Sequence, residues 1–154
     1  MVEPGTILTG ISTTASVLKT VDSLIKQARG RKRALLIELR SNIQLIDLYT
    51  EGDLPIDKVI ARLETSHVRA ALESNFNFNS LKRGKLKRST TGNVPQFRRY
   101  VSWTTERLFS NIYLKIKELQ TIIEIDPDNK GFRKSVRLIN IRKLMLLLLQ
   151  HIQS

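Results

Sequence analysis

Apolar residues along this chain recur at steps of three and four, the spacing that places side chains on one face of an α-helix. No stretch of useful length alternates between apolar and polar residues, as a half-buried β-strand would. The pattern therefore predicts an all-α fold. We expect residues 1–154 to form a single-domain antiparallel bundle of about five helices, with one long basic loop.

A basic turn at Gly30 separates the first two predicted helices. Small, uncharged residues at positions 9–16 indicate close packing of the first helix against a neighbour, and insertion into a membrane is the alternative hypothesis. The first helix is expected to bury Ile7, Ile11, Ala15, Leu18, Val21 and Ile25. The second is expected to bury Leu35, Leu36, Leu39, Ile43 and Ile46, with Leu45 and Leu48 widening the stripe.

The third predicted helix opens at Pro55, a residue tolerated in a first helical turn, and runs without interruption to Leu72. The fourth helix is predicted to start at Pro95. The apolar face of the third helix contains Ile56, Val59, Ile60, Leu63, His67, Ala70 and Ala71. The buried seam of the fourth contains Leu108, Ile112, Ile116, Leu119 and Ile123.

The last predicted helix spans residues 132–152 and has an unusual second half. Residues 144–149 are apolar on every face, which is typical of a helix inside a bundle or a membrane. This run is too short to span a bilayer, which needs about 20 apolar residues. We therefore expect a central helix around which the other helices pack.

Residues 75–94 show no periodicity and are rich in asparagine and glycine, which resist regular structure. An irregular stretch of this length is uncommon in a compact domain and is usually functional or disordered. Phe76 and Phe78 are expected to fix one end of this basic loop to the core.

The formal net charge is +12, and two segments carry nearly all of the excess. Residues 76–99 contain seven basic and no acidic side chains, and residues 129–154 contain six basic and none acidic. Such clustering predicts attraction to a polyanion, either nucleic acid or an anionic membrane surface. The segregation of charge is the strongest functional signal in the sequence.

Nucleic acid is the partner that this pattern favours, because lysine and arginine side chains neutralise phosphates. Phe78, Phe97 or Tyr100 would stack on unpaired bases if they are not core anchors. If the loop and the last helix meet in space, their cations form one continuous surface. The predicted phosphate contacts are Lys82, Arg83, Lys85, Lys87, Arg88, Arg98, Arg99, Arg133 and Arg137.

The string from Arg62 to His67, an arginine and a histidine separated by four residues, resembles the motif of the HEPN family of all-helical ribonucleases. The resemblance implies metal-independent RNA cleavage by this pair, typically at a dimer interface. The periodicity, however, places the string within one continuous helix. There the two side chains would point about 140° apart, with His67 on the apolar stripe.

Other chemistry finds little support in the sequence. The chain has no cysteine and only two histidines, so we expect no metal site and no cofactor. We predict binding rather than catalysis, with an acidic protein partner as an alternative to nucleic acid. The absence of cysteine suits a cytoplasmic location. The pattern does not fix an oligomeric state.

Overall fold

The computed structural model describes residues 14–154, which form helices and no strands. The prediction of an all-α helical bundle is confirmed. Residues 1–13, on which the hypothesis of a membrane-active first helix chiefly depends, lie outside the described residues.

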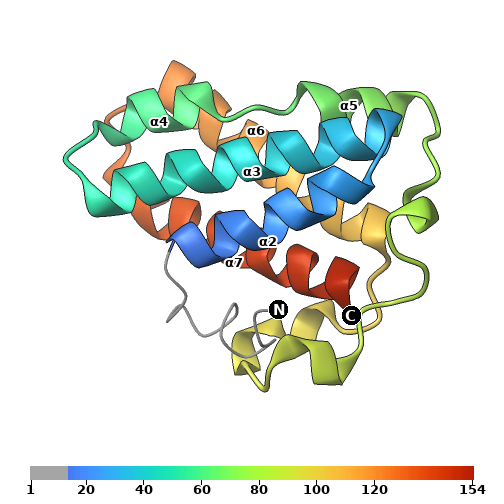
Figure 1. The fold of residues 1–154 in the computed structure, drawn as a ribbon. Coiled ribbons are helices and arrows are strands. Elements are labelled where there is room, and N and C mark those ends of the chain that lie inside the picture. Colours follow the sequence, from blue (N-terminus) through green and yellow to red (C-terminus); the bar gives the residue numbers. More distant parts are fainter. Residues whose placement is uncertain (1–13) are drawn as a thin grey trace.

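Six α-helices and four short 3₁₀ helices (η) follow one another within the described range (Figure 1). The α-helices are α2 (Thr14–Gln27), α3 (Gly30–Glu51), α4 (Ile56–Arg62), α5 (Ser66–Glu73), α6 (Thr105–Ile125) and α7 (Lys134–Gln153). The 3₁₀ helices are η1 (Phe78–Ser80), η2 (Arg88–Thr91), η3 (Pro95–Tyr100) and η4 (Lys130–Phe132).

Helix α7 is the central element, as the sequence predicted. Every side chain from Leu144 to His151 is buried, and the helix contacts α3, α4, α6 and η2. These neighbours cover the apolar run on all sides, which is why it needs no membrane around it. None of the helices within residues 14–154 is long and apolar enough to cross a bilayer.

The buried faces of α2 and α3 differ in part from the predicted ones. In α2 the core positions are Val17, Val21 and Ile25, whereas Ala15 is exposed and Leu18 only partly buried. The predicted stripe of α3 from Leu35 to Ile46 is confirmed, but Leu48 is 49% exposed. Neither correction follows from the repeat itself, because steps of three and four fit two adjacent stripes equally well.

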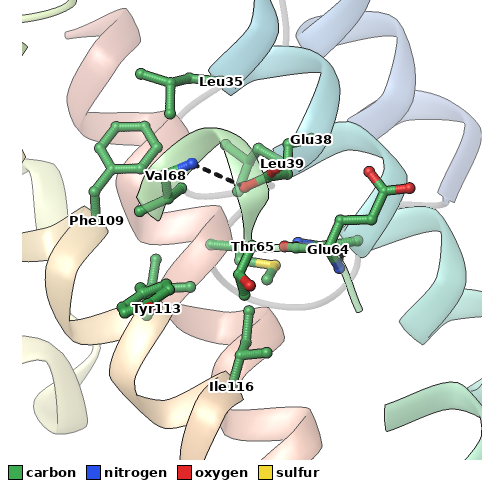
Figure 2. A pocket seen from close by; sticks show the side chains of 12 residues that line it. Leu35, Glu38, Leu39, Glu64, Thr65, Val68, Phe109, Tyr113 and Ile116 are labelled. Atoms are coloured by element: carbon green, nitrogen blue, oxygen red, sulfur yellow. Dashed lines mark hydrogen bonds between the residues drawn. The ribbon is translucent and has the colours of Figure 1, made fainter. Parts of the chain in front are cut away.

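The third predicted helix is wrong: the chain forms two helices, α4 and α5, with a break between Leu63 and Thr65. The buried carboxylate of Glu38, on α3, stabilises this break. It accepts hydrogen bonds from the backbone amides of His67 (2.7 Å) and Val68 (3.2 Å), both in the first turn of α5. Figure 2 shows the bond from Val68. Glu38 thus caps α5 in the way that an acidic side chain normally caps its own helix.

Two further side-chain amides, those of Asn42 and Gln120, hold the same break. Asn42 donates to the carbonyl of Glu64 (2.8 Å) and accepts from its amide (2.7 Å). From α6, Gln120 donates to the carbonyls of Ile60 and Leu63, both at 3.0 Å. These bonds satisfy the backbone groups that the interruption frees, so the break costs little although no glycine or proline marks it.

The fourth predicted helix begins ten residues late, at Thr105 rather than Pro95. Pro95 opens η3 instead, and the chain then turns at Ser102, whose φ is +76°. The hydroxyl oxygen of Thr104 accepts from the amide of Arg107 (3.2 Å) and so caps α6. The rest of the predicted seam, from Leu108 to Leu119, is buried.

The irregular stretch is an ordered, packed loop. Phe78 and Leu86 within it are at most 3% exposed, and Phe97 and Tyr100 in η3, which follows it, are at most 7% exposed. The loop is therefore anchored to the core at both ends and in its middle. Leu86 donates to the carbonyl of Trp103 (2.8 Å) and accepts from the amide of Ser102 (2.9 Å), which folds the loop back on itself. Its glycines and asparagines serve the turns: Asn75, Gly84, Gly92 and Asn93 have positive φ.

Candidate polyanion-binding surface

Four of the predicted phosphate contacts lie on the short stretch around Leu86. Arg83, Lys85, Lys87 and Arg88 are all exposed, while Leu86 between them is 1% exposed and hydrogen-bonded on both sides. None of the four forms an ion pair with an acid from residues 14–154. Four uncompensated cations are therefore presented by a fixed backbone.

Lys82, the fifth predicted contact, has a different environment. It is half-buried, and its ammonium donates to the backbone carbonyl of Ser154 at the end of α7. Its own carbonyl accepts from the hydroxyl of Thr105 (2.8 Å). Lys82 thus ties the start of the loop to the first turn of α6 and the last turn of α7.

His151 completes this connection. Its Nε2 lies 2.9 Å from the Thr105 hydroxyl, which already donates its proton to Lys82 and therefore accepts from the imidazole. Burial, with the nearby Lys82 ammonium, lowers the pKa of His151 from 6.5 to about 4. The imidazole is neutral at pH 7 and acts as a structural hydrogen-bond donor.

Arg98 and Arg99, both exposed, occupy the last turn of η3. The guanidinium of Arg99 lies 5.4 Å from the ring centroid of Tyr100, within cation–π range. Two neighbouring aromatic residues, Phe97 and Tyr100, face the core and are 3% and 7% exposed. With Phe78 also buried, none of the three aromatic side chains considered for base stacking is accessible.

The cations of the last helix are largely paired, unlike those of the loop. Arg142 forms an ion pair with Asp47 of α3, in which both side chains are nearly buried. Lys134 lies 2.7 Å from Asp57 of α4.

Arg137, a predicted phosphate contact, forms the third ion pair of α7. Its guanidinium lies 3.2 Å from the carboxylate of Glu118, on α6. Its guanidinium also donates to the carbonyl of Phe132 and stacks 3.9 Å from the centroid of that ring. Arg133, the other predicted contact of this helix, is exposed and precedes α7 with a φ of +55°.

The loop and the basic end of the last helix do not form one patch. Helix α7 has 20 residues and is about 30 Å long. Lys82 and the loop lie at its C-terminal end, whereas Arg133 precedes its first turn (Figure 1). Helix η3, which follows the loop, lies beside the middle of α7.

That meeting point is a cleft between η3, α6 and α7, with a volume of about 230 Å³. Arg99 is the only predicted contact that lines it; the other cations are Lys115 of α6 and Lys143 of α7. The sequence analysis missed Lys115 and Lys143 as site residues. Helical spacing places Lys143 on one face with Asn140, which also lines the cleft, but nothing in the sequence connects either to Arg99.

The arginine–histidine string also differs from expectation. Arg62 ends α4 and His67 belongs to the first turn of α5, so the two do not share a continuous helix. Both side chains are exposed, and the prediction that His67 lies on a buried stripe is wrong. The reason is the break capped by Glu38, which rotates α5 relative to α4.

Within residues 14–154, no three histidine, aspartate or glutamate side chains gather as metal ligands would. Comparisons with protein-family models, curated proteins and solved structures found no match to this chain.

Proposed function

We propose that this protein binds nucleic acid through phosphate contacts made by its basic loop, without sequence readout. One observation carries the proposal: the loop holds four exposed cations on a fixed backbone, with no compensating acid among the described residues. Arg83, Lys85, Lys87 and Arg88 are the main contacts. Arg98 and Arg99 extend them, and Arg133 is an outlying one.

The expected binding mode is electrostatic. Phosphate contacts fix orientation but carry no sequence information, and the three aromatic side chains that would stack on bases are buried. Lys82 and Arg137 already bind protein groups, so we expect little phosphate contact from either. The absence of cysteine suits a cytoplasmic location. RNA is the nucleic acid that we expect there.

The proposal is tested by titrating a single-stranded RNA of mixed sequence at several salt concentrations. For the wild-type chain, affinity should fall steeply as salt rises. Changing Arg83, Lys85, Lys87 and Arg88 together to Gln should flatten the slope of log affinity against log salt by about 3, since each lost contact removes about 0.7 for a single strand.

A charge-matched variant controls for net charge. Lys26, Arg31, Lys58 and Lys117 are exposed and lie outside the loop, and their change to Gln removes the same charge. If this variant loses as much affinity as the loop variant, binding depends on total charge and the loop has no special role. If the wild-type chain does not bind RNA but retains an acidic protein in a pull-down, the partner is an acidic protein and not nucleic acid.

The same titration checks the HEPN resemblance. Gel analysis of the RNA after incubation should show intact strands. Cleavage that disappears in His67→Ala would instead support a ribonuclease that uses Arg62 and His67.

A further inference from the structure

Among the residues that the structure describes, three cations and no carboxylate line the cleft between η3, α6 and α7. Arg99, Lys115 and Lys143 line it together with the side-chain amides of Gln96 and Asn140. In the described part of the chain, neither ammonium has an ion-pair or hydrogen-bond partner. Three like charges around one hollow repel each other, and this arrangement is stabilised when an anion enters.

The walls of the cleft strengthen that attraction. Phe97, Tyr100 and Leu144 are at most 7% exposed and form its apolar side, while Lys115 and Lys143 are half-buried. An apolar wall lowers the local dielectric constant, so charges beside it interact more strongly than in open water. Lysine and arginine with two amide donors match the oxygens of a phosphate group.

The adjacent cleft has a different charge. It lies between the same two helices, shares Lys115 and Asn140, and has a volume of about 190 Å³. There, however, Glu118 sits 3.2 Å from Arg137 and cancels its charge. The cleft at Arg99 therefore has three cations without a carboxylate among its described residues, whereas the adjacent one has two cations and the carboxylate of Glu118.

We propose that this cleft is a binding site for a phosphate monoester or pyrophosphate group, with Lys115, Lys143 and Arg99 as its ligands. The site does not depend on the loop cations around Leu86, and it holds whether or not the loop binds RNA. Small molecules and the 5′ ends of nucleic acids both carry such a group and present the same chemistry.

Isothermal titration of the full chain with inorganic pyrophosphate tests the site. We expect saturable binding at low salt that weakens about tenfold for each ammonium removed, the loss of one charge-assisted hydrogen bond. The test variant is Lys115→Gln with Lys143→Gln. The matched control is Lys58→Gln with Lys117→Gln, which removes the same charge from exposed positions outside the cleft.

Thermal unfolding without ligand confirms that the test variant folds, and pyrophosphate should raise the unfolding temperature of the wild type and the control only. Equal affinity of test and control variants, or no saturable binding by the wild type, overturns the proposal.

A second titration identifies the source of the phosphate. A short RNA with a 5′-phosphate that binds more tightly than its 5′-hydroxyl form, with the advantage lost in the test variant, assigns the site to nucleic-acid ends. Pyrophosphate binding without that advantage assigns it to small molecules. The loop variant Arg83, Lys85, Lys87 and Arg88→Gln should keep pyrophosphate binding, so failure of the RNA proposal remains distinguishable from failure of this one.

Discussion

The basic loop and the last helix carry almost the same excess of positive charge in the sequence, yet the structure uses the two differently. In α7, Lys134, Arg137 and Arg142 are each paired with an acid from another helix. In the loop, Arg83, Lys85, Lys87 and Arg88 have no such partner among the described residues. The charge of these three helix residues contributes to the fold, and the charge of the loop remains available to a ligand.

The difference follows from position. The last helix lies at the centre, so Lys134, Arg137 and Arg142 meet acids of α4, α6 and α3. The loop is packed through its apolar side chains and through the contacts of Lys82, which leaves Arg83, Lys85, Lys87 and Arg88 in water. A local excess of charge in a sequence therefore predicts a polyanion surface only where no neighbouring element supplies the opposite charge.

The largest expected effect is on the pair between Arg142 and Asp47. Arg142→Met leaves the Asp47 carboxylate, which is nearly buried, without its cation and should lower the free energy of unfolding by about 3–5 kcal/mol. Urea denaturation measures this change. Adding Asp47→Asn should recover much of it; a loss below about 1 kcal/mol would mean that the pair behaves as an exposed one.

The second effect concerns His151, where loop and helix meet. Above pH 6.5 the imidazole is neutral in both folded and unfolded chains. As pH falls from 6.5 to about 4, only the unfolded chain gains a proton, because the folded pKa is lowered to about 4. Stability should fall by about 3 kcal/mol over this window and show no further loss from this group below it.

His151→Gln removes that titration, so the difference between wild type and variant isolates it from the carboxylates. His67→Gln, at an exposed histidine, is the matched control for the loss of one histidine side chain. A wild type and His151→Gln with parallel stability curves from pH 7 to 4 would contradict a buried neutral imidazole.

The third effect is that of the two more exposed pairs of the last helix. Lys134→Met should cost about 1 kcal/mol, because Lys134 is only 17% exposed beside Asp57. Arg137→Met should cost about half as much through its ion pair, since both partners are about half exposed and screened by water. Urea denaturation at low and high salt separates these losses, which should shrink as salt rises.

The smallest effect on stability is expected in the loop. Arg83→Gln, Lys85→Gln, Lys87→Gln and Arg88→Gln should each change the free energy of unfolding by less than about 0.5 kcal/mol, because the side chains are exposed and unpaired. The same variants should weaken RNA binding. A loop variant that is markedly destabilised would remove the contrast between the two regions.

Much of the fold follows from the sequence alone. The spacing of apolar residues determined that the chain is helical and which residues of α3 and α6 face the core. The apolar run of residues 144–149 determined that the last helix is central, since such a surface must be covered by other helices in water. Glycine and asparagine marked the turns of the loop through the positive φ that they tolerate.

Tertiary structure alone decided that the chain breaks between α4 and α5, and which cations are paired with acids. The break depends on Glu38, Asn42 and Gln120, which are distant in sequence, so no local breaker could reveal it. In the same way, Lys115 and Lys143 join Arg99 only because three elements converge on one cleft. Backbone periodicity is a local property of the chain, whereas capping and charge pairing depend on which side chains the packed helices bring together.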